Sequence, residues 1–308
     1  MLTLARRRRL PPPTRSSSCT GGAHWGPSEP PVPPGAVLGA GYEVVAHLRR
    51  GRRLDVYDVW DRERACRCVG KTLRPERTGD QVAADRLRTE GRLLGAIAHP
   101  HLVRAYETAT TLDRPRPLVI LETLPGHTVD RLIGRHGRLP PGDVALLGMQ
   151  LASAVAHLHH HGWLHLDIKP ANIVNTAGRA VLLDLSLAAR IGQPCAGGTF
   201  DYLSPEQARG EAATEATDVW GLGATLYEAL GGSPPFAAHT HRRPDGQRRY
   251  PQAELAAPPL RTRRRSSRKL AQAIDACLHP QPTDRPSLSE LTAQLAIRSG
   301  IDLRTFGT

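Results

Sequence analysis

The sequence contains few lysines, asparagines and aromatic residues, and it lacks any long uninterrupted apolar run. Its 308 residues include three lysines against 38 arginines, only two asparagines, and 4% aromatic residues. Apolar stretches such as residues 144–158 are broken by Gln, Ser and His. None of them reaches the roughly 18–20 apolar residues that a membrane-spanning helix needs. We therefore expect no membrane anchor.

We also expect no secretory signal peptide and no disulfide framework. The basic residues Arg6 to Arg9 are followed by prolines instead of the apolar core of a signal peptide. The five cysteines are an odd number, which favours reduced thiols and a cytoplasmic location. Cys66 and Cys68 have no second pair of ligands at zinc-site spacing, so no metal–thiolate centre is expected.

The net charge of +12 is concentrated in two segments. Residues 1–40 contain five Arg and one Glu, a charge of +4, and residues 242–269 contain nine Arg, one Lys, one Asp and one Glu, a charge of +8. Because the rest of the chain is neutral overall, a chain-wide surface for nucleic acid is not indicated. Aromatic side chains that stack on bases do not alternate with the basic ones. We expect no nucleic acid, and we interpret residues 242–269 as either a solvated loop or a docking site for an acidic protein partner.

The chain divides into a tail, a strand-rich part and a helix-rich part. Residues 1–40 are rich in Pro and lack periodicity, so they are predicted to be a disordered tail. Residues 41–124 are predicted to form a small β-rich lobe with one main helix at 80–97. Residues 125–300 are predicted to form a larger, mostly helical lobe, and residues 301–308 a second tail. The fold class is therefore α+β. Strands are expected at residues 42–48, 55–61, 64–73, 102–109, 117–123, 173–176 and 180–183, and helices at 142–161, 216–230, 268–278 and 287–297.

The strongest chemical signal is the stretch from His165 to Asn172, which reads HLDIKPAN. It places Asp167, Lys169 and Asn172 within six residues, and Asp184 follows twelve residues later. A carboxylate can accept a proton from a hydroxyl group, and a lysine can neutralise a phosphate. An asparagine and a second carboxylate can bind Mg²⁺. This set of residues favours phosphoryl transfer.

These motifs resemble those of the protein kinase family, and in particular those of bacterial eukaryotic-like Ser/Thr kinases. The resemblance covers about residues 41–298 and implies the two-lobed protein kinase fold. Lys71 resembles the lysine that holds the ATP phosphates, and Glu90 resembles its ion-pair partner. Lys71 and Lys169 are two of only three lysines, and arginine would be a poor substitute for Lys71. Further family landmarks are Gly198-Thr199-Phe200, Ser204-Pro205-Glu206, residues 218–223 and Asp284-Arg285-Pro286.

The resemblance also implies a role for individual residues. Asp167 would take the proton of the acceptor hydroxyl, and Asn172 and Asp184 would hold Mg²⁺, with Mn²⁺ as an alternative ion. Lys169 and Thr199 favour Ser/Thr acceptors in proteins over Tyr. Residues 218–223 would form a buried helix that anchors the catalytic loop, and Arg285 would pair with Glu206. The catalytic set is Asp167, Lys169, Lys71 and Glu90, and ATP would contact Leu48, Gly51, Val56, Val69, Lys71, Glu122, Leu124 and Val174.

The chain departs from the family's pattern at three places. The glycine-rich loop corresponds to residues 49–54, which retain only Gly51. Leu166 stands where an arginine commonly precedes the catalytic aspartate, and the metal-binding triplet at 184–186 reads Asp-Leu-Ser. We hypothesise that the four arginines at positions 49, 50, 52 and 53 bind phosphate in place of the missing glycines. Residues 187–198 contain no Ser, Thr or Tyr, which together with Leu166 predicts activity without phosphorylation of this segment.

Three other functions compete with the interpretation as an active protein kinase. The eroded glycine-rich loop is compatible with a pseudokinase, a regulatory module that binds ATP or a partner with little turnover. A small-molecule kinase of the aminoglycoside type is disfavoured by Lys169, Thr199 and the Ser-Pro-Glu motif. A nucleic-acid-binding protein is supported only by the two basic segments.

Overall fold

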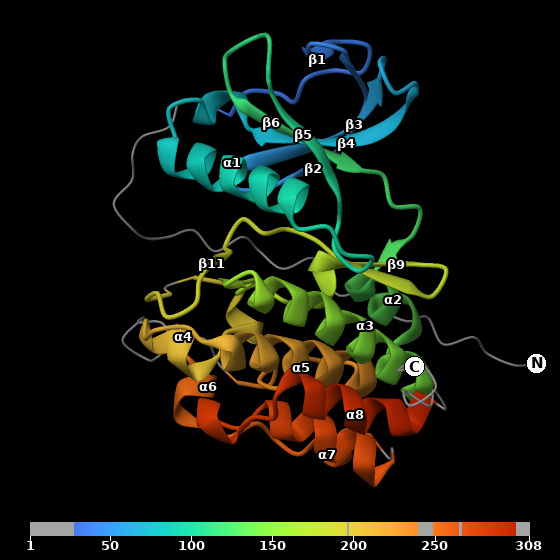
Figure 1. The fold of residues 1–308 in the computed structure, drawn as a ribbon, viewed down its shortest axis with the longest axis vertical. Coiled ribbons are helices and arrows are strands. Elements are labelled where there is room, and N and C mark those ends of the chain that lie inside the picture. Colours follow the sequence, from blue (N-terminus) through green and yellow to red (C-terminus); the bar gives the residue numbers. More distant parts are fainter. Residues whose placement is uncertain (1–27, 196, 240–248, 265–266, 300–308) are drawn as a thin grey trace, which may run out of the picture.

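The chain folds into a small β-rich lobe above a larger helical lobe (Figure 1). The computed structural model describes residues 28–195, 197–239, 249–264 and 267–299. The α+β, two-lobed prediction is confirmed. Within these residues, no helix is both long and apolar enough to cross a membrane.

The small lobe is built on a six-stranded sheet with the order β1-β2-β3-β4-β6-β5. Its middle strands pair antiparallel through short turns, as the alternating pattern predicted. Helix α1 packs against β5 and β6, and the side chain of Asp80 caps its first turn by accepting from the amide of Ala83. The elements are β1 (Val37–Gly39), β2 (Tyr42–Arg50), β3 (Leu54–Asp61), β4 (Cys66–Leu73), α1 (Gln81–Ala96), β5 (Ala105–Thr110) and β6 (Pro117–Glu122).

The sheet begins earlier in the chain than the sequence indicated. The prediction of a disordered tail through residue 40 is wrong for residues 28–40, because β1 pairs with β2 and Leu38 is buried in the core of the small lobe. A three-residue strand among prolines and glycines shows no periodicity, so only its partner strand reveals it. Residues 1–27 and the predicted tail at 301–308 lie outside the described residues.

The large lobe is centred on helices α3 and α5, which are buried on most of their faces. Gly148 on α3 permits this packing, because a Cβ atom there would lie 2.6 Å from Leu295 on α8 and 2.9 Å from Leu226 on α5. The sheet β10-β9-β7 lies at the junction with the small lobe. The elements are β7 (His127–Thr128), α2 (Val129–His136), α3 (Pro141–His160), β8 (Trp163–Leu164), β9 (Ile173–Thr176), β10 (Arg179–Leu182), β11 (Ala189–Arg190), α4 (Pro205–Arg209), α5 (Glu215–Gly231), α6 (Pro251–Glu254), α7 (Arg268–Cys277) and α8 (Leu288–Ser299).

Candidate active site

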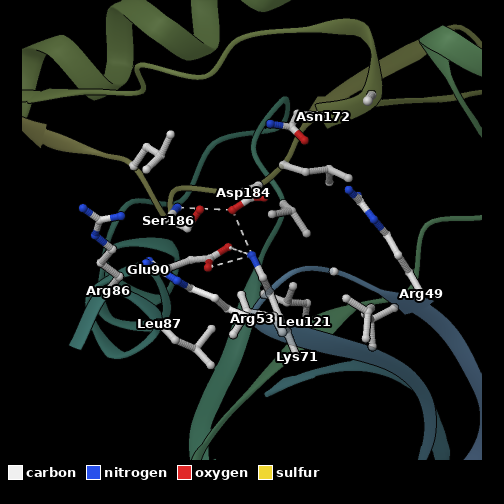
Figure 2. A pocket seen from close by; sticks show the side chains of 18 of the residues that line it. Arg49, Arg53, Lys71, Arg86, Leu87, Glu90, Leu121, Asn172, Asp184 and Ser186 are labelled. Carbon is white, nitrogen blue, oxygen red and sulfur yellow. Dashed lines mark hydrogen bonds and ion pairs between the residues drawn. The ribbon is translucent and has the colours of Figure 1, made fainter. Parts of the chain in front are cut away.

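Lys71, Glu90 and Asp184 meet between the two lobes (Figure 2). The ammonium of Lys71 donates to both carboxylate oxygens of Glu90, at 2.9 and 2.8 Å, and to Oδ1 of Asp184 at 2.9 Å. Lys71 comes from β4, Glu90 from α1, and Asp184 from the segment that follows β10. The expected contact between Lys71 and Glu90 is present, and it ties helix α1 to the sheet.

Gly91 allows α1 to approach the sheet closely enough for this contact. A Cβ atom at Gly91 would lie 2.9 Å from a methyl carbon of Val119 on β6 and would collide with Thr108 on β5. A larger residue would therefore push the helix away from the sheet. Glycine at this position keeps Glu90 within reach of Lys71.

The charges at this contact are buried together and shift one another's pKa. Glu90 is fully buried and Lys71 is 7% exposed. Burial alone would lower the pKa of Lys71, but the charges of Glu90 and Asp184 outweigh burial and raise it above its ordinary value. Burial would raise the pKa of Asp184, yet the Lys71 ammonium holds that pKa well below its usual range. The site therefore keeps a charged ammonium beside an ionised Asp184 at neutral pH.

A second polar cluster is centred on Asp167, in the loop between β8 and β9. The ammonium of Lys169 donates to Oδ2 of Asp167 at 2.5 Å and also to the hydroxyl of Thr199. The Thr199 hydroxyl donates to Oδ1 of Asp167 at 2.7 Å, and its amide donates to the same oxygen at 3.0 Å. The Asn172 amide donates to the Asp167 carbonyl and to Oδ2, both at 3.0 Å. Asp167 is thus held in one orientation by three neighbours.

Asp218 on α5 anchors the loop that carries Asp167. Its two carboxylate oxygens accept from the amides of His165 and Leu166, each at 2.8 Å, and Oδ2 also contacts Nε2 of His159 at 2.8 Å. Leu166 has a φ of 67°, a left-handed conformation that is strained for a leucine. The buried carboxylate compensates for this strain, and helix α5 is the buried anchor that the sequence predicted.

A cavity of about 680 Å³ lies beside these charged groups. It is apolar on the side formed by β3, β4 and the start of the large lobe, and it is charged where Lys71, Glu90 and Asp184 lie (Figure 2). Six of the residues expected to contact a nucleotide, apart from Lys71, line it. These are Gly51, Val56, Val69, Glu122, Leu124 and Val174.

Leu48 is not among the residues that line the cavity, so its contact with a nucleotide stays a prediction. Its side chain is 55% exposed. Strand β2 has a bulge between His47 and Arg49, which pair with Tyr57 and Val56, so Leu48 is left without a partner. The extra residue changes which side chains face the cavity, and Arg49 lies there instead.

The four arginines of the β2–β3 hairpin do not act as one group. Arg49, Arg52 and Arg53 line the cavity, whereas Arg50 lies against Asp55. Arg53 also reaches Asp80 at 3.4 Å. Sequence reasoning missed a further arginine of the cavity, Arg86 on α1. The α1 register offers a signal, because Arg86 lies one helical turn before Glu90 and therefore on the same face.

Asn172 and Asp184 present the oxygen ligands that a magnesium ion takes. Both residues line the cavity, and amide and carboxylate oxygens are hard ligands suited to Mg²⁺. Across the described ranges, no group of three His, Cys, Asp or Glu side chains could hold a metal ion alone. The two residues therefore fit an ion that takes its other ligands from phosphate oxygens and water.

Leu166 lies in a small apolar cluster that holds the segment after Asp184. Leu164, Leu166, Cys195 and Ala213 are buried together. Strand β11 pairs with β8, and the amides of Gly192 and Cys195 donate to the carbonyls of Ala213 and Glu211 at 2.8 and 3.2 Å. Apolar packing and backbone hydrogen bonds thus order this segment around Leu166.

The end of the same segment is fixed by an ion pair. Arg285 binds both carboxylate oxygens of Glu206, at 2.7 and 2.9 Å, and also donates to the carbonyl of Ala216 at 2.7 Å. Both charged side chains are buried. The expected pair of Arg285 and Glu206 is present and joins the segment to the helices of the large lobe.

The described part of the basic segment 242–269 uses several of its arginines internally. Arg249 pairs with Glu254 at 3.0 Å, and Arg264 donates to the carbonyls of Leu139 and Leu230. The exposed basic residues that remain include Arg261, Arg268 and Lys269. Residues 240–248, 265 and 266 lie outside the described residues.

Comparison with known proteins shows to which family the chain belongs. The protein kinase domain matches residues 42–295. The chain is similar to the serine/threonine-protein kinase PknB of Mycobacterium leprae, with 34% identity over 66% of this chain and 32% of that protein. It is also similar to a probable serine/threonine-protein kinase of Corynebacterium efficiens, with 30% identity over 65% of this chain and 32% of that protein. A probable serine/threonine-protein kinase of Streptomyces coelicolor is 31% identical over 65% of this chain and 31% of that protein. The chain thus spans about a third of the length of these relatives. With its two lobes, its Lys71–Glu90 contact and its Asp167 loop, the chain belongs to the protein kinase family.

Proposed function

We propose that this protein is an ATP-dependent protein kinase that transfers the γ-phosphate of Mg-ATP to Ser and Thr hydroxyls of proteins. One observation carries the proposal: the Lys71 group lines the cavity, and the Asp167 cluster is assembled beside it and is joined to it through Asn172. A chain that had lost turnover would not need to keep both sets of contacts. The names of the relatives, which are serine/threonine-protein kinases, support the same choice of acceptor.

Each group has a defined task in this reaction. Lys71, held by Glu90, would position the phosphates of ATP, which would lie in the cavity beside Gly51. Asp167 would orient the acceptor hydroxyl and take its proton, and the Lys169 ammonium beside it would stabilise the charge on the transferring phosphate. Asn172 and Asp184 would hold Mg²⁺ or Mn²⁺. The ion, when bound, neutralises phosphate charge.

The acceptor is proposed to be Ser or Thr because of the contacts around Thr199. Its hydroxyl lies between Lys169 and Asp167, at the place where an acceptor hydroxyl must approach. A short Ser or Thr side chain brings its hydroxyl to Asp167 only if the peptide backbone comes close. Gly198, directly before Thr199, lets this segment pack against the loop that carries Asp167, because a Cβ atom there would lie 2.6 Å from Leu203 and 3.4 Å from the carbonyl oxygen of Leu166.

We also propose a cytoplasmic location and an acidic protein partner. The odd number of cysteines, which favours reduced thiols, supports the location. Arg261, Arg268 and Lys269 support the partner, since they are exposed and lie close together in sequence around the start of α7. Acidic side chains would complement this surface, and binding would weaken as salt rises.

The function is tested with purified protein, radiolabelled ATP, Mg²⁺ and a generic basic protein substrate. The wild-type chain should label the substrate on Ser and Thr, and chelation of Mg²⁺ should stop the reaction. Asp167→Asn keeps an oxygen for the Thr199 contact but cannot take a proton, so labelling should fall by at least about 10²-fold. Asp85→Asn, at an exposed position of α1, is the matched control and should behave as wild type.

Absence of labelling by the wild-type chain, with ATP still bound, would identify a pseudokinase instead. Labelling that is equal in the wild type and in Asp167→Asn would mean that a contaminating kinase causes it. Phosphoproteomics of cells that carry wild-type or Asp167→Asn protein would then identify the natural substrates.

A further inference from the structure

Residues 28–36, which precede the family's matched region, lie along the small lobe and contact the hairpin between β2 and β3. The amide of Val32 donates to the hydroxyl of Tyr57 on β3 at 3.1 Å, and Val32 packs on the core of the small lobe. The amide of Gly35 donates to the carbonyl of Val44 at 2.8 Å. We call residues 28–36 the N-terminal strap.

Arg50 links the strap to the hairpin. Its guanidinium donates to both carboxylate oxygens of Asp55, at 2.9 and 2.7 Å, and its remaining nitrogen donates to the carbonyl of Glu29 at 2.6 Å. Asp55 is fully buried and also contacts His47 and Tyr57. A planar guanidinium can bind a carboxylate with one edge and a carbonyl with another, so Arg50 joins the strap to a rigid base.

Arg74 makes a second link between the same two segments. One nitrogen of its guanidinium donates to the hydroxyl of Ser28 at 2.7 Å, and another reaches the carbonyl of Gly51 at 3.5 Å. The backbone amide of Arg74 donates to the carbonyl of Arg53 at 2.9 Å. The side chain of Glu29 is held separately, by Arg114 at 2.7 Å.

The linked residues are the direct neighbours of those that line the cavity. Arg49 and Gly51 line the cavity on either side of Arg50, and the amide of Gly51 closes the hairpin on the carbonyl of Leu54 at 2.7 Å. This hairpin lacks two of the three glycines of the family's phosphate loop. Residues 30–34 include four prolines, which restrict the strap before it binds and so reduce the entropy lost on binding.

We propose that the N-terminal strap is part of the nucleotide-binding site, and that Ser28 and Glu29 act through Arg74 and Arg50 to hold the β2–β3 hairpin in the conformation that binds ATP. Arg50 is a positioning residue that does not touch the nucleotide. The proposal rests on the proposed function, because the hairpin is taken to cover ATP. Its physical basis is preorganisation: a hairpin that is already fixed loses less entropy when it closes on a ligand.

Two truncations that differ by three residues test the strap. A chain that starts at Ser28 keeps every described contact, whereas a chain that starts at Pro31 loses Ser28, Glu29 and Pro30. The shorter chain should show a KM for ATP about three- to tenfold higher, as expected when one or two hydrogen bonds are lost. Its kcat and its KM for the protein substrate should stay within about twofold of the longer chain.

A substitution in the full chain provides a second test that keeps Asp55 paired. Arg50→Lys retains a positive charge beside Asp55 but lacks the fork that also reaches the Glu29 carbonyl. It should raise the KM for ATP about as much as the truncation to Pro31. In the chain that starts at Pro31, Arg50→Lys should change the KM for ATP little further, because the contact with the Glu29 carbonyl is already missing.

Hydrogen exchange of the nucleotide-free proteins separates this proposal from the proposed function. The amides of residues 49–54 should exchange faster in the chain that starts at Pro31 than in the chain that starts at Ser28, whether or not either transfers phosphate. Equal exchange and equal KM for ATP in the two chains would overturn the strap proposal. Faster exchange in a protein that neither binds nor turns over ATP would keep the link to the hairpin but refute its role in ATP binding, together with the proposed function.

Discussion

At the scale of single residues, the ion pair of Lys71 and Glu90 is expected to affect both stability and the proposed activity. Glu90 is fully buried, and burial raises its pKa against the pull of Lys71. Removing Lys71 therefore leaves a buried carboxyl group without its cation. Any single substitution of Lys71 or Glu90 would therefore change activity and stability together.

Lys71→Met should lower kcat/KM by about 10²–10³-fold, because the phosphates of ATP lose the charge that positions them. It should also lower the unfolding free energy, since Glu90 must be buried unpaired or take up a proton. The double variant Lys71→Met/Glu90→Gln removes that buried charge and should recover much of the stability without recovering activity. Near wild-type turnover in the folded double variant would contradict the assigned role of Lys71.

The arginines that line the cavity are predicted to contribute to ATP binding. Arg49 and Arg52 line the cavity, and among the residues that the structure describes they have no ion-pair partner. Guanidinium groups bind phosphate well, so Arg49→Gln/Arg52→Gln should raise the KM for ATP severalfold, with a larger effect at low salt. Arg88→Gln/Arg92→Gln removes the same charge from the exposed face of α1 and is the control. A KM equal to that of the control would show that the hairpin arginines are merely solvated.

At the scale of elements, α5 holds the loop that carries Asp167 in a strained conformation. The carboxylate of Asp218 accepts from two backbone amides and contacts His159, and it is buried. Burial would raise the pKa of Asp218, but the hydrogen bond and charge of His159 hold that pKa below its ordinary value. The carboxylate form thus stabilises the fold above the ordinary carboxyl pKa of about 4, and this contribution is lost as the pH falls below it.

Asp218→Asn should therefore cost about 2–4 kcal/mol at pH 7, because an amide cannot accept from both backbone amides of the loop. Stability should be measured by denaturant unfolding between pH 3 and 7. The variant should lose less stability on acidification than the wild type, whereas Asp143→Asn, at an exposed position in the first turn of α3, should follow the wild-type curve. Parallel pH curves for the wild type and Asp218→Asn would rule out this role for the carboxylate.

Periodicity predicted the long elements and missed several short ones, although the short strands β9 and β10 were predicted beside the turn at Ala177-Gly178. Strands β2 to β4 and helices α1, α3, α5, α7 and α8 show alternating or helical apolar patterns over eight or more residues, and they lie within a few residues of their predicted bounds. The three residues of β1 and the four of α6 are too few to show a period. Helix α2 follows the Pro125-Gly126 turn, and its eight residues bury only Val129 and Ile133.

The local motifs located most of the cleft, because each motif keeps its spacing in the fold. Asp167, Lys169 and Asn172 are close in sequence and contact one another directly. The exposed position of Leu48 could not be predicted, because a bulge in β2 leaves no mark in the residue pattern. Arg50 was grouped with its neighbours because its partners, Asp55 and the Glu29 carbonyl, are known only when the chain has folded.

At the scale of the whole molecule, the described residues between Asp184 and Glu206 are held by apolar packing, strand pairing and an ion pair. In many kinases a phosphorylated residue of this segment pairs with an arginine that precedes the catalytic aspartate. Here that position is Leu166, which packs with Cys195 and Ala213. Strand pairing of β11 with β8 and the buried Arg285–Glu206 pair hold the two ends of the segment.

We therefore expect full activity without phosphorylation of this segment. Protein treated with a broad phosphatase and then freed of it should phosphorylate a generic substrate as fast as untreated protein. Leu166→Arg introduces the arginine that precedes the catalytic aspartate in many kinases, but it places an unpaired charge in an apolar cluster. It should therefore lower the free energy of unfolding by about 2–4 kcal/mol, and it should also lower activity. Leu166→Met keeps the apolar contact and should lose less than about 1.5 kcal/mol. Loss of most activity after phosphatase treatment, with recovery on rephosphorylation at a mapped site between residues 185 and 206, would show that a phosphate, and not the apolar cluster, orders the segment.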